Sequence, residues 1–188
     1  QYQYPLVSGG YLDIPDKSAL GNSDDETTIK KIRITRIHLE EDTARLLHDP
    51  ANSASLVDFN RAGVPLMELV TEPDFRTGQE VISFGEELQK ILRYVGASDA
   101  DMEKGQMRVE VNISLRELLT KDSIPERPLG TKVEIKNINS FKYAADAVDF
   151  EINRQTALLE RGETIIQETR GWNEQKKESL SQRKKESA

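Results

Sequence analysis

The chain has 188 residues, of which 36% are hydrophobic and 31% charged, and its formal net charge is -7 at pH 7. This length fits one good-sized domain, or one domain with an appendage. The negative charge argues against a protein that coats nucleic-acid phosphates generally, but it leaves room for a specific RNA contact. The absence of Cys excludes disulfides, thiolate metal sites and Cys nucleophiles. No run reaches the ~18 apolar residues of a membrane span, so we expect no membrane partner.

The segment Ile29–Asp42 is predicted to form a long strand. Side chains of a strand alternate with a period of two, but the apolar residues change phase between Ile34 and Ile37. This change of phase predicts a β-bulge near Thr35. Beyond the bulge, the polar face carries three residues in register: Arg36, His38 and Glu40. On this pattern alone, the histidine is interpreted as an ordinary surface residue.

The segment Ser55–Phe75 is predicted to be a hairpin of two strands joined by an Asn-Arg-Ala-Gly turn. Glu68 lies in the second strand, within a mainly apolar run. A buried carboxylate is costly unless it is paired or bound to a metal. Glu68 therefore either faces water, pairs with an Arg, or serves as a cation ligand or catalytic carboxylate.

Several other segments are predicted to be short hairpins or loops. A short hairpin is expected in Gln1–Pro15, around two glycines. Polar or charged loops are expected at three places: Asp16–Thr28, Thr43–Ser55 and Arg116–Leu129.

Two helices are predicted from apolar residues at helical spacing and from terminal signals. The first is Thr77–Val95, where Thr77 and Glu80 match a capping box and Gly96 follows the last turn. The second begins after Asn139 or Ser140 as the cap and runs to about residue 161.

Three further strands are predicted, of which two alternate between apolar and polar residues. In Gln106–Leu115 the polar face carries Arg108, Glu110 and Asn112, and in Gly130–Asn139 it carries Lys132, Glu134 and Lys136. Glu163–Trp172 starts as one more strand, whereas Lys176–Ala188 is interpreted as a mobile or linker-like tail.

The order of these elements favours an α+β fold with a largely antiparallel sheet and helices packed on one side. We assign residues 1–172 to one domain and residues 173–188 to a linker or flexible tail.

Acidic and basic side chains share the polar faces of these strands, and this combination suits magnesium and phosphate. Mg²⁺ takes a few carboxylates together with water and substrate phosphates, and phosphoryl transfer needs positioning and charge neutralisation. The sequence contains no Walker A, GxGxxG, GxSxG or HExxH motif. An ATP site would therefore lie on a sheet face. Spacing alone leaves the alternative open that each strand is simply amphipathic.

The motifs together resemble the GatB family, the B subunits of the aspartyl/glutamyl-tRNA(Asn/Gln) amidotransferases. The resemblance rests on RITRIHLEEDTARLLHD, SLVDFNRAGVPLMELVTEPD, ILRYVGASDADMEKGQMRVEVNISLR, GTKVEIKNINSF and QETRGWNE, which follow in order from about Ile34 to Glu174. It implies a glutamine-synthetase-like catalytic cradle with a curved, largely antiparallel sheet.

The resemblance also implies an activity, with Mg²⁺ and ATP as cofactors. Members of this family phosphorylate the side-chain carboxylate of Glu on tRNA(Gln), or of Asp on tRNA(Asn), with the ATP γ-phosphate. Ammonia, released from glutamine by the partner amidase, then displaces phosphate to form the amide. The implied partners are this amidase subunit, the small third subunit of the heterotrimer and the misacylated tRNA. The implied location is the cytoplasm of a bacterium, or a mitochondrion or plastid.

By motif, the resemblance implies Glu41 and Glu68 as carboxylates of the Mg²⁺ and ATP site, with weaker claims for Glu40 and His38. Glu110 stands where many members have Asp; it is expected to be catalytic and to bind metal, although the longer side chain moves its oxygens outward. Contacts with ATP, phosphate or the acceptor end are expected from Arg108, Glu134 and Lys136.

Two departures from the family pattern suggest an internal fragment. At its N-terminus the sequence starts at Gln1 without Met and lacks the family's segment with the Glu-Val-His motif, and at its C-terminus it lacks the domains that grip tRNA. We therefore expect the fragment alone to have little or no activity. The competing hypothesis is a non-catalytic RNA-binding or scaffold module, although RNA platforms prefer aromatic and cationic residues and aromatics make up only 6% here.

Overall fold

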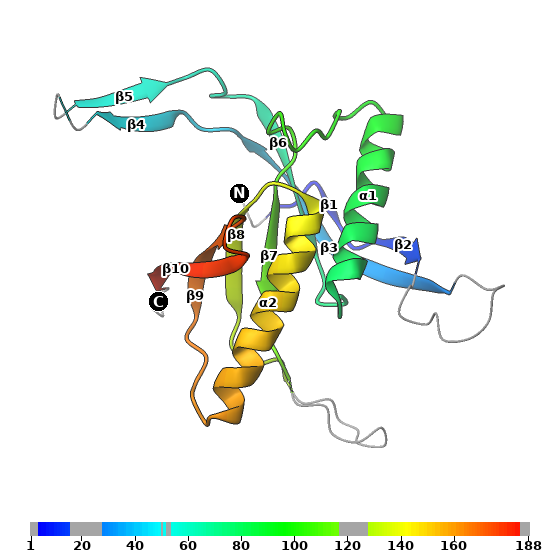
Figure 1. Ribbon diagram of the computed structural model, residues 1–188. Coiled ribbons are helices and arrows are strands. Elements are labelled where there is room, and N and C mark those ends of the chain that lie inside the picture. Colours follow the sequence, from blue (N-terminus) through cyan, green and yellow to red (C-terminus); the bar gives the residue numbers. More distant parts are fainter. Residues whose placement is uncertain (1–3, 16–27, 50, 52–53, 117–127, 185–188) are drawn as a thin grey trace. The chain divides into compact units, whose positions relative to one another are not determined.

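The computed structural model describes residues 4–15, 28–49, 51, 54–116 and 128–184 (Figure 1). The loops predicted at 16–28 and 116–129 lie almost entirely outside the described residues. The chain forms two compact units, residues 1–13 with 30–74 and residues 14–29 with 75–188. Each unit is described by itself below.

The sheet of the first unit is built around the long strand β3 (Ile29–Glu41). Strands β1 (Val7–Ser8) and β2 (Tyr11–Pro15) both pair with β3, as does β6 (Pro65–Thr71). The hairpin predicted in Gln1–Pro15 is therefore wrong, because its two strands pair with β3. The predicted bulge is confirmed: the β3–β6 register shifts between Ile34 and Arg36.

A separate two-stranded sheet is formed by β4 (Arg45–Asp49) and β5 (Ala54–Asp58), which Figure 1 shows as a projecting hairpin. The hairpin predicted for Ser55–Phe75 is thus wrong, and so is the loop predicted for Thr43–Ser55. The Asn-Arg-Ala-Gly segment does form a turn between β5 and β6, but these two strands do not pair with each other: β5 pairs with β4, and β6 pairs with β3. The backbone N–H of Gly63 donates to the Asp42 carbonyl over 2.9 Å and closes this junction.

The second unit contains a four-stranded sheet in the order β10-β9-β8-β7. Its strands are β7 (Val109–Ile113), β8 (Val133–Ile138), β9 (Glu168–Asn173) and β10 (Glu178–Lys184). The β8–β9 pair is parallel and the other two pairs are antiparallel. Strand β10 corrects the predicted mobile tail over residues 176–184. The proposed domain boundary at residue 172 stays a prediction.

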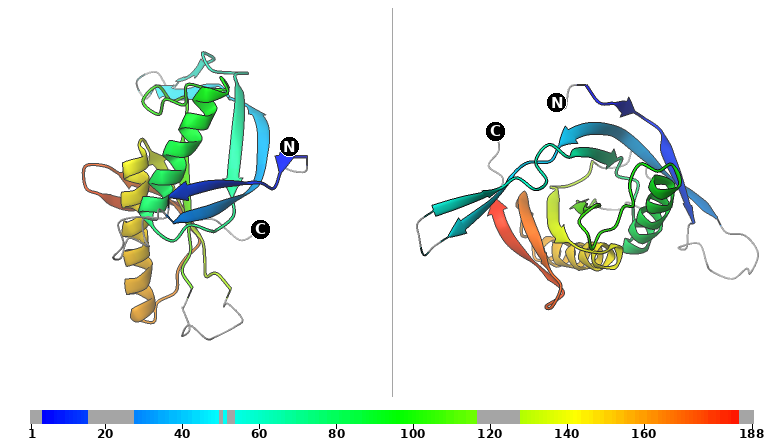
Figure 2. Two further views of the ribbon diagram at one scale, coloured as in Figure 1. Left: turned by 90° about the vertical axis from the view of Figure 1, so that its right-hand side faces the viewer. Right: turned by 90° about the horizontal axis from the view of Figure 1, so that it is seen from above.

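Both predicted helices are confirmed with their caps. Helix α1 (Gly78–Tyr94) begins after Thr77, and α2 (Phe141–Glu160) begins after Ser140; each cap side chain accepts a hydrogen bond from a backbone N–H of the first turn. The helices lie side by side (Figure 2). They approach closely at Gly78, where a Cβ would lie 2.7 Å from the Ala145 carbonyl oxygen.

Helix α2 packs against the sheet of the second unit and forms the core with it. The buried members of this core come from β7, β8, α2 and β9: Val111, Ile113, Ile135, Ile138, Ala144, Ala147, Val148 and Trp172. The predicted α+β class with largely antiparallel pairing is confirmed. Among the described helices, none has the length and apolar character needed to cross a membrane.

Candidate functional site

The first group of candidate residues lies on one face of the β3–β6 pair. His38 is directly opposite Glu68, Arg36 is opposite Val70, and Glu40 is opposite Leu66. Cross-strand partners point to the same side of a sheet, and the side alternates along each strand. Arg36, His38, Glu40 and Glu68 therefore share this face, which we call the β3–β6 face.

Glu68 is partly buried on this face. Within the part of the chain that the structure describes, its Oε2 atom is buried without a hydrogen-bond partner. Burial raises the pKa of Glu68 above its ordinary value of 4.5, a hydrogen bond with the Glu40 carboxyl and its charge raise it further, and the charges of Arg36 and His38 act in the opposite direction. Two adjacent carboxyl groups with an unused buried oxygen fit a divalent cation, because a bound cation satisfies that oxygen and offsets their repulsion.

Two expectations about β3 need revision. His38 is only 1% exposed, so its interpretation as a surface histidine is wrong. Glu41 is exposed and pairs with Pro65, which places it on the opposite face from Glu68 and Glu40. The role that the resemblance implies for Glu41 stays a prediction, and the register favours Glu40 as the companion of Glu68.

The raised pKa of Glu68 leads to a prediction about how the free energy of unfolding depends on pH. Folded Glu68 keeps its proton to a higher pH than the unfolded chain does, so its stabilising contribution is present below pH 4.5 and is lost as the pH rises through the folded pKa. Glu68→Gln is therefore expected to raise the free energy of unfolding at pH 7 to 8 and to leave it unchanged near pH 4. Urea unfolding of the purified protein without nucleotide or metal measures this difference.

Glu86→Gln, at an exposed position of α1, is the matched control, since surface substitutions usually change stability by less than about 0.5 kcal/mol. A Glu68→Gln variant less stable than the wild type at pH 8 would contradict the prediction.

The second group lies on the face of β7 and β8 that points away from α2. Lys136 Nζ is 3.0 Å from Glu110 Oε1 and 3.6 Å from Glu134 Oε1. A β-bulge creates this arrangement: the register shifts between Val109 and Val111, so that Glu110 faces an extra residue of β8. We call Glu110, Glu134 and Lys136 the lysine–carboxylate cluster.

The lysine of this cluster remains charged. Burial acts to lower the pKa of Lys136, but hydrogen bonds to Glu110 and Glu134 and their negative charges outweigh it, so the pKa is raised. Its side chain is still 39% exposed, and that of Glu110 is 47% exposed. A fixed, accessible ammonium group of this kind can contact a phosphate. Arg108 precedes β7 and is exposed as well.

The predicted site residues therefore belong to two groups, one in each unit. Glu40, Glu41, Glu68 and His38 belong to the first unit, and Arg108, Glu110, Glu134 and Lys136 to the second. Among the described residues, no group of three or more His, Asp or Glu side chains is placed to hold a metal ion. A pair of carboxylates suits Mg²⁺, which usually keeps several waters and binds substrate phosphates.

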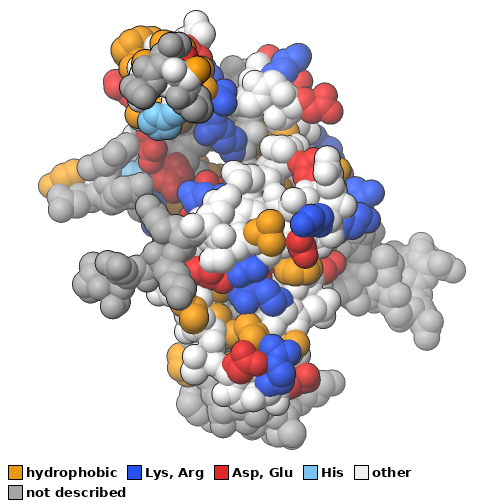
Figure 3. Space-filling model, turned by 60° about the vertical axis from the view of Figure 1, so that its left-hand side comes forward, with side chains coloured by type: hydrophobic (Ala, Val, Ile, Leu, Met, Phe, Trp, Pro, Cys, Tyr) orange, Lys and Arg blue, Asp and Glu red, His pale blue; other side chains and the backbone are white. Residues whose placement is uncertain are grey.

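One residue next to the second group was not singled out by the sequence. Thr169 of β9 is 5% exposed, and its hydroxyl donates to Glu134 Oε2 over 2.9 Å. The only available signal was its position in the QETRGWNE motif. On the face shown in Figure 3, Lys and Arg side chains are interspersed with Asp and Glu. That mixture differs from the continuous basic surface of a general nucleic-acid binder.

Comparison with known proteins places this chain in a family. The family model described as the GatB/GatE catalytic domain matches residues 1–188, and the chain belongs to that family.

Curated relatives agree with this assignment. Proteins named as the B subunit of aspartyl/glutamyl-tRNA(Asn/Gln) amidotransferase are 44% identical in Crocosphaera subtropica and 47% identical in Nostoc punctiforme, each over 99% of this chain and 37% of the relative. The protein of that name in Coxiella burnetii is 45% identical over 100% of this chain and 36% of the relative. The chain thus spans little more than a third of these relatives.

Proposed function

We propose that this chain supplies the ATP-dependent, phosphorylating part of a tRNA-dependent amidotransferase. The family assignment supports this proposal, since its family model describes a catalytic domain and its relatives are named as B subunits of an amidotransferase. The observation that carries it is Glu68, whose buried Oε2 has no hydrogen-bond partner among the described residues and which has a second carboxyl group beside it. A carboxylate oxygen that stays buried without a hydrogen-bond partner is costly, and a bound cation would offset that cost.

The proposed cofactor is Mg²⁺, held by Glu68 with Glu40. When bound, it neutralises charge on the ATP phosphates. The register leaves Glu41 on the other face, so this proposal does not use it. In the second unit, Lys136, anchored by Glu110 and Glu134, is proposed as a phosphate contact in its own right, and the metal proposal does not depend on it.

The proposed reaction has two steps. An oxygen of the substrate side-chain carboxylate, Glu on tRNA(Gln) or Asp on tRNA(Asn), attacks the γ-phosphorus, and ADP leaves. Ammonia then attacks the acyl carbon, inorganic phosphate leaves, and the amide forms. We infer that glutamine supplies the ammonia through the partner amidase, with the small third subunit as a further partner, in the cytoplasm of a bacterium or in an organelle.

The proposal is tested by ADP formation in the complete, assembled protein. We expect ADP release with Mg²⁺-ATP when Glu-tRNA(Gln) or Asp-tRNA(Asn) is present, and not with correctly charged Gln-tRNA(Gln). The matched control is the same misacylated tRNA without Mg²⁺. Tight tRNA binding with no ADP formation under any of these conditions would instead favour the RNA-binding or scaffold module.

A further inference from the structure

The β4–β5 hairpin exposes apolar side chains on both of its faces. Leu46 lies opposite Val57 and Leu47 lies opposite Leu56, so one of these two pairs points to each side of the sheet. All four side chains are exposed, from 41% for Leu47 to 59% for Leu46 and Leu56. A two-stranded hairpin is only marginally stable by itself in water, and independent stability needs three or more strands with a hydrophobic face. The hairpin is therefore a candidate docking surface.

The outer edges of this hairpin are the second feature that favours docking. Strands β4 and β5 form a sheet of their own, and no further strand pairs with either of them within the described part of the chain. The edge of a sheet presents backbone N–H and C=O groups with which a strand of another molecule can pair. An added strand would also bring the hairpin closer to the number of strands that a stable sheet needs.

The sequence of β4 is complementary to itself when two copies run antiparallel. The strand reads Arg45-Leu46-Leu47-His48-Asp49. In an antiparallel pair centred on Leu47, the arginine of each copy lies opposite the aspartate of the other, and Leu47 lies opposite Leu47. Cross-strand pairs of opposite charge stabilise a sheet, whereas like charges directly opposite destabilise it. Charged residues on an edge strand often prevent pairing, but the two charges of β4 attract each other across this pair.

The same arrangement extends an apolar row across the sheet. Leu56 is the partner of Leu47 within each hairpin, so two paired hairpins carry the leucines 56, 47, 47 and 56 side by side on one face. The result is a sheet of four strands with an apolar row across it, which meets the requirement for independent stability. Contacts along the row also cover part of each Leu47 side chain.

The edge of β5 does not offer the same complementarity. In an antiparallel pair of β5 strands centred on Leu56, Asp58 of one copy lies opposite Ala54 of the other, so no pair of opposite charges forms. Pairing of β4 with β5 of the next molecule would leave one edge open at each end and continue as an open chain of molecules. The β4 edge is therefore the one that supports a closed pair.

From these observations we propose that the β4–β5 hairpin is a dimerisation arm, which binds the same hairpin of a second copy of this chain through antiparallel β4 strands centred on Leu47. A two-fold contact of this kind closes after two copies. The contact goes beyond the proposed function, because it involves neither Glu68 nor Lys136 and requires no nucleotide.

Reversal of the charges tests the proposed pairing. Sedimentation equilibrium of the complete protein measures the Kd of the dimer. Arg45→Asp places two acidic groups opposite each other at both ends of the contact, and we expect it to raise this Kd about tenfold or more, because two attractive pairs become repulsive. The double variant Arg45→Asp with Asp49→Arg restores opposite charges and is expected to return the Kd to within about threefold of the wild type.

The matched control for this measurement is Lys142→Asp, which reverses the charge of an exposed residue of α2 and is expected to leave the Kd of the dimer unchanged. A complete protein that stays monomeric at every concentration would overturn the inference. So would a double variant whose Kd is no lower than that of Arg45→Asp.

A single cysteine gives an independent test of the register, because residues 1–188 contain no Cys. The two copies of residue 47 lie about 5 Å apart in the proposed pair, which is within reach of a disulfide. Leu47→Cys is therefore expected to form a dimer linked from 47 to 47 in oxidised glutathione, as identified by peptide mass. Leu56→Cys is the matched control, since its two copies lie roughly 14 Å apart and should not become linked.

Other occupants of the hairpin would give different results. If another subunit of the assembled protein covers it, the thiol of Leu47→Cys is protected from alkylation in that assembly and no disulfide from 47 to 47 forms. If nothing covers it, the thiol reacts freely and the protein stays monomeric. Either result overturns the inference, and neither changes the ADP formation by which the proposed function is tested.

Discussion

Glu68→Gln is expected to lower ATP-dependent phosphorylation of the misacylated tRNA by about 100- to 1,000-fold in the complete, assembled protein, the range found when one preorganised electrostatic group is removed from a site. The amide keeps the shape of the side chain but cannot supply the charge that a divalent cation needs. The initial rate of ADP formation at saturating Mg²⁺-ATP measures the loss. The same substitution is expected to raise the free energy of unfolding at pH 7 to 8, so a loss of activity could not be explained by unfolding.

Glu72→Gln is the matched control for this prediction. Glu72 follows β6 and accepts a hydrogen bond from Thr35, which a glutamine oxygen can also accept. We expect its activity to stay within about threefold of the wild type, as a structural substitution away from the reacting groups allows. A Glu68→Gln protein with wild-type ADP formation would remove the main support for the proposed function.

The same assay distinguishes the two neighbouring glutamates of β3. The register places Glu40 on the β3–β6 face and Glu41 on the opposite face, whereas the family resemblance favours Glu41. From the geometry we expect the larger loss from Glu40→Gln. A larger loss from Glu41→Gln would contradict the choice of Glu40 and favour the residue that the resemblance implies.

Local periodicity allowed parts of β3 and both helices to be predicted from the sequence. The bulge between Ile34 and Arg36 follows from two apolar phases that one regular strand cannot satisfy. The helix starts follow from Thr77 and Ser140, because their side chains accept the hydrogen bonds that the first turn leaves unused. These signals all lie within a few residues of the feature they predict.

Strand pairing could not be predicted in the same way. The turn before β6 looks like a hairpin turn, but β5 pairs with β4 and β6 with β3. Strand pairing depends on partners that are far apart in the sequence, and a turn sequence does not specify which strands pair. Strand β10 was missed because its composition is polar. It is stabilised by hydrogen bonds of Ser179 with Arg170 and of Ser181 with Glu168, and a hydropathy pattern carries no information about such bonds.

The candidate site shows the same division between local and distant information. Glu68 was recognisable as a carboxylate in an apolar strand, but its neighbour Glu40 depends on the β3–β6 register. The pairing of Glu110 with Lys136 requires the bulge in the β7–β8 register. Glu151 was missed altogether, because a glutamate three residues before an arginine resembles an ordinary exposed pair on a helix.

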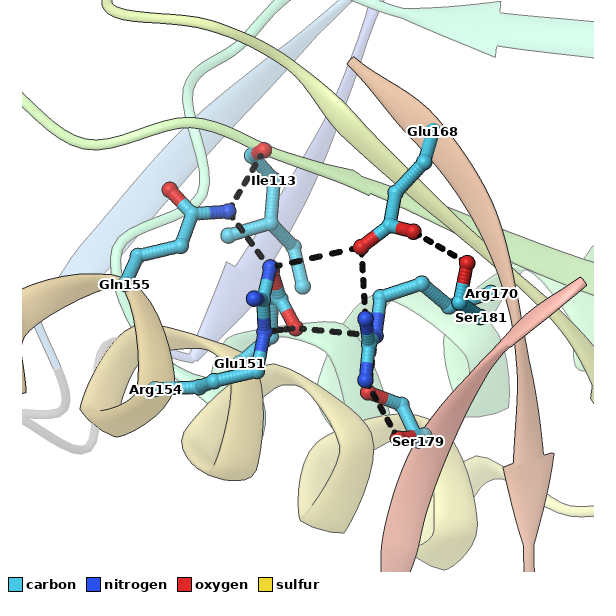
Figure 4. Close-up of polar contacts among 8 residues, drawn as sticks. All are labelled: Ile113, Glu151, Arg154, Gln155, Glu168, Arg170, Ser179 and Ser181. Carbon is cyan, nitrogen blue, oxygen red and sulfur yellow. Dashed lines mark hydrogen bonds and ion pairs between the residues drawn. The ribbon is translucent and has the colours of Figure 1, made fainter. Parts of the chain in front are cut away.

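Glu151 is in fact completely buried and lies within a network that joins α2 to β9 (Figure 4). Its Oε1 accepts hydrogen bonds from Arg154 over 2.6 Å and from Gln155 over 2.8 Å, and its Oε2 lies 3.9 Å from Arg170 Nε. Gln155 also donates to the carbonyl of Ile113 on β7.

The charges of this network balance. Burial acts to raise the pKa of Glu168, but hydrogen bonds from Ser181 and Arg170 outweigh it, and the pKa is lowered, so Glu168 stays ionised. The hydrogen bond to Glu151 raises the pKa of Arg154. Two carboxylates therefore face two guanidinium groups, and removal of either carboxylate leaves one positive charge in excess.

Glu151→Gln is accordingly expected to lower the free energy of unfolding by about 3 kcal/mol, the usual cost of leaving one charge of a buried pair without its partner. Urea unfolding at pH 7 measures the change, and Glu160→Gln, at an exposed position near the end of the same helix, should change stability by less than about 0.5 kcal/mol. A double variant, Glu151→Leu with Arg154→Leu, should lose less stability than Glu151→Gln, because it removes opposite charges together and keeps the network neutral. If the double variant is the less stable of the two, the network contributes through its individual hydrogen bonds and not through charge balance.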